Sequence, residues 1–185
     1  MMNKLIHIYQ SPTFGEDWFT YPSLYTHVVD RYPSGSTFVE VGAWKGKSTA
    51  YMCVEIANSD KNINFFCVDT WEGSKEHTAA EVMSLYQIFM TNMKALKNYF
   101  TPYKMTSLQA ATLFDNNSCD FVFIDASHEY CDVKDDIDAW LPKIKSGGIL
   151  AGHDYDDNWP GVKQAVNERF QDFFVKDGCW AVYVP

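Results

Sequence analysis

The stretch FVEVGAWKGKST, residues 38–49, decides the fold. Its apolar start is typical of a buried parallel strand, and the residues after Gly46 favour the opening of a helix. Gly42 and Gly46 let the backbone turn sharply and let a ligand approach the chain closely. Amide groups at the start of the helix point toward such a ligand. Glu40 disfavours a phosphate, because like charges repel at short range, and it suits a ligand with a positive amino group.

Two familiar nucleotide motifs do not match this turn. A phosphate-binding P-loop needs four residues between its first glycine and Gly-Lys-Ser/Thr, whereas Gly42 and Gly46 enclose three. A dinucleotide fingerprint needs a glycine where this chain has Trp44. The remaining pattern, acid-x-Gly-x-x-x-Gly from Glu40 to Gly46, stays open at this point, as does a plain strand-to-helix turn without a ligand.

Composition indicates one globular domain over residues 1–185. Hydrophobic residues make up 46% of the chain and aromatic residues 16%, enough for a sizeable core. The net charge of −9 argues against sequence-independent binding to nucleic acid, which needs a basic face. The sequence shows neither a signal peptide nor an apolar run long enough for a membrane span. The five cysteines lack paired spacing, which favours free thiols in a reducing cytoplasm.

Apolar periodicity and turn residues predict alternating strands and helices. The predicted strands cover residues 38–41, 63–69, 103–106, 121–125 and 149–154, and the predicted helices cover residues 24–29, 47–58, 76–100, 107–111, 133–141 and 162–170. Pro102 is expected to end the long helix, and Ser107 is expected to cap the next one. Asp177-Gly178 signals a closing hairpin between residues 173–175 and 180–184. The alternation predicts a doubly wound α/β sheet.

The first 35 residues differ from the rest of the chain. They are rich in aromatic residues that are interrupted by proline and glycine. They are expected either to pack on the edge of the core or to form a flap that covers the substrate. Residues 36–185 form the expected cofactor-binding core.

Asp69 is a candidate ribose-binding residue. It closes the second predicted strand and lies 23 residues after Gly46. That is near the roughly 20-residue offset at which an acid holds ribose hydroxyls in a βαβ nucleotide site. A carboxylate can accept hydrogen bonds from both hydroxyls. Trp71 follows closely, and its flat ring is placed to cover an adenine.

Several segments together resemble one family. They are the turn from Glu40 to Gly46, Asp69 at a strand end, IDASH at residues 124–128 and GGILAGHDY at residues 147–155. The chain resembles the class I S-adenosylmethionine-dependent methyltransferases, in particular a group of the methyltransferase domain family 24 type that acts on small molecules and sugars. The turn resembles their motif I. The resemblance covers residues 36–185 and implies a Rossmann-like, seven-stranded sheet, mostly parallel with the last strand antiparallel.

The resemblance also implies where S-adenosylmethionine binds, across the carboxyl ends of the strands. The implied cofactor-binding residues are Glu40, Gly42 and Gly46 at the methionine part, Asp69 at the ribose, Trp71, Ser107 and Leu108 at the adenine, and Asp125 facing the sulfonium and the substrate.

Asp125, His128, His153 and Asp154 follow neighbouring strands, so we expect them to converge where open α/β sheets bind ligands. The spacing from Asp125 to His153 and Asp154 is similar to that of the metal ligands in catechol-type O-methyltransferases. A divalent metal, magnesium or manganese, is therefore a candidate cofactor, with Asp125, His153 and Asp154 as ligands. His153 stands where that family has a carboxylate, which also admits zinc or no metal. Without a metal, His128 or His153 is the candidate general base beside Asp125.

The expected function is methyl transfer from S-adenosylmethionine to a small molecule or sugar, on oxygen. The alternatives are a cofactor-binding protein without turnover, a subunit whose partner completes the site, and a P-loop-like nucleotide-binding enzyme. The short chain leaves little room for a large substrate domain. We therefore expect either an open pocket or a homo-oligomer in which a second subunit completes it.

Overall fold

The computed structural model describes residues 4–73 and 82–185. The strands are β1 (Thr37–Val41), β2 (Asn64–Asp69), β3 (Thr101–Lys104), β4 (Cys119–Ile124), β5 (Ile144–Gly152), β6 (Phe174–Lys176) and β7 (Cys179–Tyr183). The α-helices are α1 (Pro22–Arg31), α2 (Lys47–Asn58), α4 (Leu85–Asn92), α5 (Ser107–Ala111), α6 (Tyr130–Trp140) and α7 (Pro160–Arg169), and short 3-10 turns are η1 (Pro12–Phe14), η2 (Lys94–Leu96) and η3 (Leu141–Lys143). Within these described ranges no helix is long and apolar enough to cross a bilayer.

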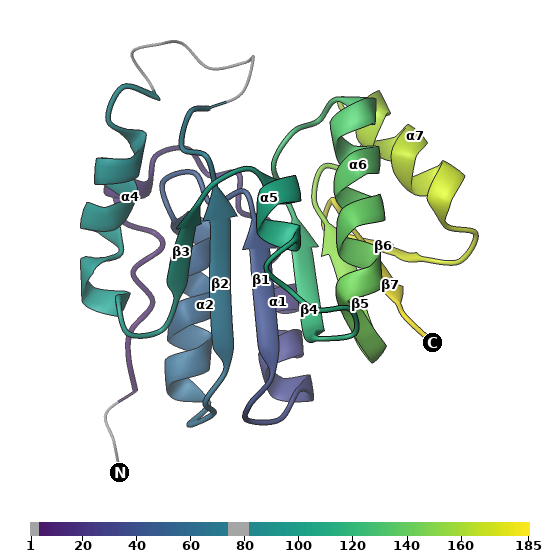
Figure 1. Ribbon diagram of the computed structural model, residues 1–185. Coiled ribbons are helices and arrows are strands. Elements are labelled where there is room, and N and C mark those ends of the chain that lie inside the picture. The colour runs from purple at the N-terminus through teal and green to yellow at the C-terminus, as the bar shows by residue number, and fades with distance from the viewer. Residues whose placement is uncertain (1–3, 74–81) are drawn as a thin grey trace.

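The seven strands form one sheet in the order β3-β2-β1-β4-β5-β7-β6 (Figure 1). The pairs β1·β2, β1·β4, β2·β3 and β4·β5 are parallel, whereas β7 runs antiparallel to both β5 and β6. The predicted fold, with an antiparallel last strand, is confirmed. The strand order reverses between β1 and β4, and such a switch point is where open α/β sheets bind ligands at the carboxyl ends of the strands.

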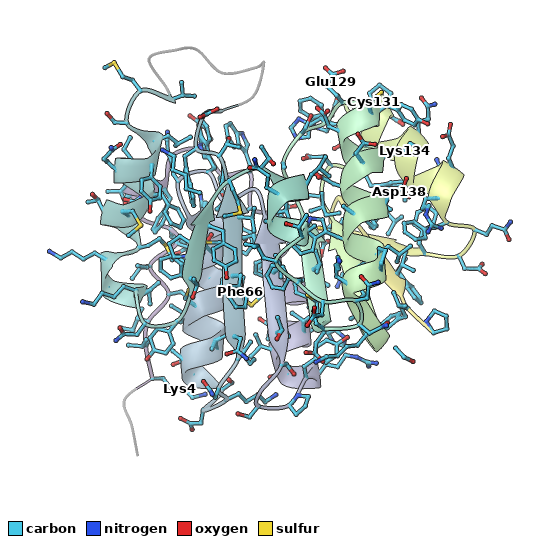
Figure 2. The ribbon with its side chains drawn as sticks, in the orientation of Figure 1. Lys4, Phe66, Glu129, Cys131, Lys134 and Asp138 are labelled. Atoms are coloured by element: carbon cyan, nitrogen blue, oxygen red, sulfur yellow. The ribbon has the colours of Figure 1, made fainter. Side chains whose placement is uncertain are left out.

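Side chains alternate along the central strands and pack into two hydrophobic cores, one on each face of the sheet. Phe38 and Phe121 pack on the face covered by α1, α2 and α4, whereas Val39 and Val122 pack on the face covered by α5, α6 and α7 (Figure 1). Because both faces are covered, a central strand is apolar at nearly every position. Lys134 on α6 lies on the outside, as Figure 2 shows, whereas the acids Glu40 and Asp136 are buried.

The predicted helix over residues 76–100 is wrong beyond Asn92, and its first residues, 76–81, lie outside the described residues. Helix α4 ends at Asn92, and the chain continues through η2. The chain turns there because Leu96 and Phe100 are buried and the next residues join the sheet. Pro102 does not end a helix but lies within β3. Proline is tolerated there because β3 is an edge strand.

The predicted cap of α5 is also corrected. Thr106, not Ser107, caps this helix, and the Thr106 side chain and Gln109 form a capping box. Ser107 Oγ instead accepts a hydrogen bond from Trp140 Nε1 at 2.9 Å. This contact ties the start of α5 to the end of α6, and it fixes one wall of the region beyond the strand ends.

Glu40 is buried beneath the glycine turn. It alternates with Val39 and so points to the same face as Phe38, where it is 1% exposed. Tyr25 Oη donates to Glu40 Oε1 at 2.8 Å, and the Thr49 hydroxyl donates to Oε2. Burial raises the pKa of Glu40 to about 7, although its hydroxyl partners act in the opposite direction. The carboxyl therefore joins β1 to α1 and α2 from inside the core.

The stability of Glu40→Gln relative to wild type is expected to increase as the pH rises. The folded-state pKa, about 7, lies above the ordinary value of 4.5. Between these values the carboxyl is ionised in the unfolded state but still protonated in the folded state, so the wild type loses stability as the pH rises. We expect the unfolding free energy of Glu40→Gln, relative to wild type, to gain roughly 2 to 3 kcal/mol between pH 5 and pH 8. Urea denaturation at both pH values measures it. Glu72→Gln, at an exposed position, serves as the control, and an equal shift in this control would contradict the assignment.

Candidate functional site

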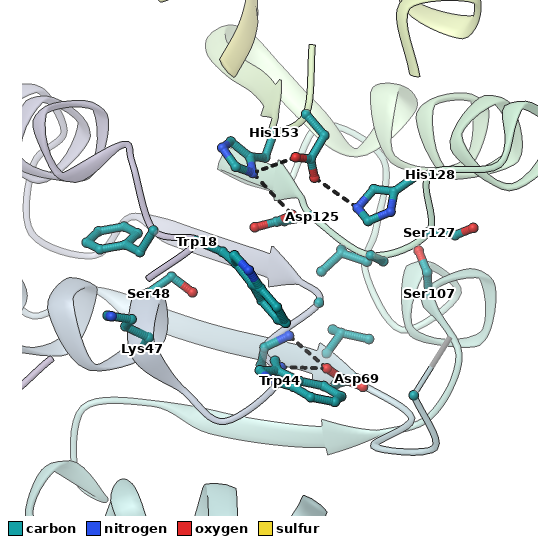
Figure 3. A pocket seen from close by; sticks show the side chains of 18 of the residues that line it. Trp18, Trp44, Lys47, Ser48, Asp69, Ser107, Asp125, Ser127, His128 and His153 are labelled. Atoms are coloured by element: carbon teal, nitrogen blue, oxygen red, sulfur yellow. Dashed lines mark hydrogen bonds and ion pairs between the residues drawn. The ribbon is translucent and has the colours of Figure 1, made fainter. Parts of the chain in front are cut away.

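A cavity of about 900 Å³ opens at the carboxyl ends of the central strands (Figure 3). It lies at the switch point between β1 and β4. Five parts of the chain line it: the turn after β1, the end of β2, the start of α5, the loop after β4 and the residues after β5. Part of the aromatic-rich N-terminal segment, from Phe14 to Tyr21, forms a further wall.

Asp69 holds the glycine turn in shape. The backbone amides of Ala43 and Trp44 both donate to Asp69 Oδ2 at 2.8 Å, and the amide of Trp71 donates to Oδ1 at 2.7 Å (Figure 3). Burial raises the pKa of Asp69, and these amide hydrogen bonds oppose the increase. Asp69 thus fixes the turn after β1 and the turn after β2. Its Oδ1 accepts one of these three bonds and retains capacity for a ligand hydroxyl.

Gly42 brings the turn against the end of β4. Its φ is +90°, and a Cβ at this position would lie 1.8 Å from the carbonyl oxygen of Asp125. No side chain fits there, so the glycine is required for this close approach. Gly46 also has a φ of +90°, but a Cβ there would meet Met93 and Phe89. Gly46 therefore serves packing against α4 and its C-terminal cap, and it does not line the cavity.

Four predicted side chains converge on the opposite wall (Figure 3). His128 Nε2 lies 2.9 Å from Asp154 Oδ2, and His153 Nδ1 lies 3.2 Å from Asp154 Oδ1 and 3.7 Å from Asp125 Oδ1. Potential ligand atoms of Asp125, His128 and Asp154 all lie within 4.8 Å of one another. Among the described residues, this is the set that could hold a metal ion. Its histidine is His128, whereas the sequence predicted His153 as the third metal ligand.

The cluster separates charge between its histidine and aspartate members. Burial alone would lower the pKa of His153, but hydrogen bonds and charge from Asp125 and Asp154 outweigh it and raise that pKa to about 10. Burial would raise the pKa of Asp154, but hydrogen bonds from His128 and His153 hold it well below its usual range. The structure therefore favours a protonated His153 and an ionised Asp154 on this wall of the cavity.

Two consecutive residues of the N-terminal segment fix this cluster. Tyr21 Oη donates to Asp125 Oδ2 at 2.6 Å. Thr20 Oγ1 lies 3.0 Å from His153 Nε2 and donates its proton to the carbonyl oxygen of Asp177 at 2.8 Å. Since the single hydroxyl proton of Thr20 is used there, Thr20 accepts from His153 Nε2–H. Tyr21 and Thr20 thus orient a carboxylate and an imidazole from outside the strand ends.

Some residues expected from the sequence face elsewhere. Glu40 is enclosed by Tyr25 and Thr49, as described above, and it does not line the cavity. The Trp71 ring is 3% exposed and packs on Tyr86 and Phe89, away from a position over an adenine. Leu108 is also absent from the cavity wall, whereas Gly42, Asp69, Ser107, Asp125, His128, His153 and Asp154 line it.

Other lining residues were not singled out from the sequence. Trp18, Trp44 and Lys47 all face the cavity. Lys47 Nζ pairs with Asp17 at 2.8 Å and so joins α2 to the N-terminal segment. The aromatic richness of residues 1–35 was the available signal for Trp18. The two tryptophans near the turn, Trp44 and Trp71, could not be told apart by pattern alone.

A family model described as a methyltransferase domain matches residues 39–155, which include the glycine turn and the Asp125 cluster. The chain belongs to this methyltransferase domain family. Its fold and the position of its cavity agree with that assignment. The matched range ends before the β6–β7 hairpin and begins after the N-terminal segment.

Two curated relatives of this methyltransferase domain are described as uncharacterized proteins. Protein y4gI of Sinorhizobium fredii is 29% identical over 116 residues, which is 63% of this chain and 13% of the relative. Protein R132 of Acanthamoeba polyphaga mimivirus is 28% identical over 140 residues, which is 74% of this chain and 60% of the relative. The chain therefore spans less than two thirds of either relative.

Solved structures show the same fold at low sequence identity. The O-methyltransferase NovP superposes with a TM-score of 0.61 at 17% identity, covering 88% of this chain and 78% of NovP. CalS11, a TDP-rhamnose 3′-O-methyltransferase of calicheamicin biosynthesis, gives a TM-score of 0.62 at 12% identity, covering 88% of this chain and 76% of CalS11. The methyltransferase domain described here shares their architecture.

Tyr21→Phe is expected to destabilise the protein by about 1.5 to 3 kcal/mol, because it removes a buried hydroxyl that donates to the Asp125 carboxylate. Urea denaturation measures the loss. Tyr183→Phe, on the half-exposed ring of β7, is the matched control and is expected to change stability by less than about 0.5 kcal/mol. Equal effects of the two substitutions would show that the Tyr21 hydroxyl has no special partner.

Proposed function

We propose that this protein transfers a methyl group from S-adenosylmethionine to a hydroxyl oxygen of a small molecule. One observation carries the proposal: the glycine turn and the Asp125 cluster face the same cavity, and Gly42 contacts the backbone of Asp125. A cofactor at the turn would therefore lie next to the carboxylate and imidazole groups. Membership of the methyltransferase domain family supports the same reaction class.

The chemistry of the cavity wall fits this cofactor. Lys47 and Ser48 lie in the first turn of α2 and line the cavity. The first amides of a helix lack intrahelical partners and favour an anion such as the methionine carboxylate. Asp69 lies across the turn, and its Oδ1 can accept a bond from a ribose hydroxyl. Ser107 adds a polar group on the side of α5.

S-adenosylmethionine supplies an electrophilic methyl group on a positively charged sulfur. This chain's own task is to hold the acceptor hydroxyl in line and to receive its proton. Asp125 Oδ1 and the imidazole of His128 are the proposed proton acceptors on the cavity wall. His153, which is already protonated on both ring nitrogens, would position Asp125 and Asp154 by hydrogen bonds and charge. Tyr21 and Thr20 keep Asp125 and His153 in place during turnover.

A divalent cation is the finer part of the proposal. Two carboxylates and an imidazole are a donor set suited to manganese, with magnesium also possible where oxygen ligands dominate. Asp125, His128 and Asp154 would hold the ion. Such an ion lowers the pKa of a bound hydroxyl group. Tyr21 already fixes one lone pair of Asp125, which orients the other oxygen of that carboxylate toward the cluster.

The acceptor class rests on cavity size and on analogy. A volume of about 900 Å³ has room for a nucleoside cofactor and a small acceptor. NovP is described as an O-methyltransferase, and CalS11 is described as acting on the sugar of TDP-rhamnose. These descriptions support oxygen as the acceptor atom. A cofactor-binding protein without turnover is the competing proposal, and a turnover assay separates the two.

Two substitutions are expected to separate cofactor binding from methyl transfer. Asp69→Asn places an amide nitrogen or a weaker acceptor opposite the amides of the glycine turn, so we expect at least tenfold weaker binding of S-adenosylhomocysteine. Asp125→Asn is expected to leave this affinity within threefold and to lower methyl transfer at least a hundredfold. Calorimetry and an assay of transferred methyl groups measure the two quantities.

Asp115→Asn, an exposed acid away from the cavity, is the control for both measurements. Tight binding of ATP with no binding of S-adenosylhomocysteine would contradict the proposed cofactor. Wild-type transfer rates in Asp125→Asn would contradict the proposed reaction centre.

The metal is tested separately. Calorimetric titration with manganese is expected to show one site in the wild type and none in Asp154→Asn, because that substitution removes one of three ligands. Full methyl transfer by protein treated with a chelator would contradict a metal role and leave Asp125 and His128 as the proton acceptors.

A further inference from the structure

The cavity has three parts, and the range matched by the family model contains two of them. The glycine turn, Asp69 and Ser107 form the part proposed for the cofactor, and the Asp125 cluster forms the wall opposite the turn. The third part is one short segment, residues 14–21, of which all except Gly15 line the cavity. This segment lies outside residues 39–155, the range that the family model matches. The side chains of residues 14–21 are therefore not part of what the family model describes.

The segment is held in place by contacts at both ends. Near its start, Asn92 Nδ2 donates to the carbonyl oxygens of Thr13 at 3.1 Å and of Lys45 at 2.9 Å. Near its end, Thr20 donates to the carbonyl oxygen of Asp177 in the β6–β7 turn. Asp17 pairs with Lys47 between these ends. The wall is thus built before any ligand arrives, which lowers the ordering cost of binding.

The exposed ring of this wall is Trp18. Its side chain is 55% exposed in spite of its size, and its ring centroid lies 6.2 Å from that of Trp44. Figure 3 shows the Trp18 ring between the Asp125 cluster and the glycine turn. Large aromatic side chains that remain exposed inside a concave site are common anchors for flat, apolar ligand faces. Trp18 therefore offers a platform for a ring.

The charge of the cavity is strongly one-sided. Among the described residues that line it are seven carboxylates, Glu16, Asp17, Asp69, Asp125, Glu129, Asp132 and Asp154, and two cations, Lys47 and the protonated His153. That lysine is already paired with Asp17. The pair of Lys47 and Asp17 is neutral as a whole. If a divalent cation and a sulfonium cofactor offset the charges near Asp125, Glu16 remains as the negative charge beside Trp18. A ligand that carries a carboxylate or phosphate would meet like charge there.

We propose that residues 14–21 form the acceptor subsite, with Trp18 as its ring platform, and that the subsite takes uncharged or cationic hydroxylated ring compounds and rejects anionic ones. This inference rests on the proposed methyl transfer and adds the class of acceptor. It sets the chain apart from a methyltransferase that acts on a nucleotide sugar, whose diphosphate would face these carboxylates.

The test uses two probe series, each of which keeps one hydroxylated ring and carries a neutral, a cationic or an anionic substituent. The aromatic series is catechol, dopamine and 3,4-dihydroxybenzoate, and the sugar series is methyl glucoside, glucosamine and glucose 6-phosphate. Calorimetry measures binding of each probe at pH 7 to the full chain with manganese, with and without saturating S-adenosylhomocysteine. In at least one series we expect the neutral and cationic probes to bind at least tenfold tighter than the anionic probe. Tighter or equal binding of the anionic probe, or no binding in both series, overturns the proposal.

Two double variants test whether residues 14–21 cause the discrimination against the anionic probe. The double variant Glu16→Gln/Asp17→Asn is expected to reduce the discrimination against the anionic probe at least fivefold, because it removes two charges and releases Lys47. The control Asp115→Asn/Asp172→Asn removes two exposed acids outside the cavity and is expected to leave the discrimination unchanged. Equal effects of the two double variants overturn the assignment.

Trp18→Ala separates the acceptor subsite from the cofactor subsite. We expect it to weaken the best probe at least fivefold and to change the affinity for S-adenosylhomocysteine less than twofold, whereas Phe174→Ala, on an exposed edge strand, changes neither. The opposite pattern would place Trp18 in the cofactor subsite and overturn the proposal. If S-adenosylhomocysteine fails to bind the wild type, the proposed methyl transfer fails. The probe measurements without it then still decide which class of ligand residues 14–21 bind.

Discussion

The site depends on one buried carboxylate that binds backbone amides from two separate turns. Asp69 accepts the amides of Ala43 and Trp44 after β1 and the amide of Trp71 after β2. Without this acceptor, three amides would lose their partners where strands β1 and β2 end, and an unpaired buried amide is costly. The same charge shapes the turn on which the proposed cofactor would rest. In the proposed function, Asp69 therefore serves both structure and binding.

A second constraint comes from chain ends that have no part in the family model. The N-terminal segment and the β6–β7 turn meet through Thr20 and Asp177, and both reach His153. Tyr21 extends the same connection to Asp125. The strands bring Asp125 and His153 to one edge of the sheet, and these outer segments set their orientation. The fold shared with the family thus determines where the cluster lies, and the segments outside the family model determine the hydrogen bonds around it.

The fold was predictable because strand and helix signals were strong in the core. Buried apolar runs and acids at strand ends placed Asp125, His128, His153 and Asp154 together, since parallel strands end at one edge. The face of Glu40 also follows from alternation with Val39, but a carboxylate at a strand end had instead predicted contact with a ligand. Burial next to Tyr25 overrode that interpretation.

Other features could not be read from local pattern. The partners of Thr20 and Tyr21 lie more than 100 residues away in sequence, and an irregular segment has no periodicity that would place it. The long helix was over-extended because apolar spacing continues through Leu96, although the chain there already turns toward the sheet. Tertiary packing, not propensity, decides where such a helix ends.

The absence of one side chain has a mechanical consequence. Because Gly42 lies against the carbonyl of Asp125 with no clearance for even a methyl group, the first turn cannot approach the tip of the fourth strand any further. Close-packed interiors transmit displacement of this kind. A ligand that pushed the turn toward β4 would therefore displace the backbone of Asp125 as well.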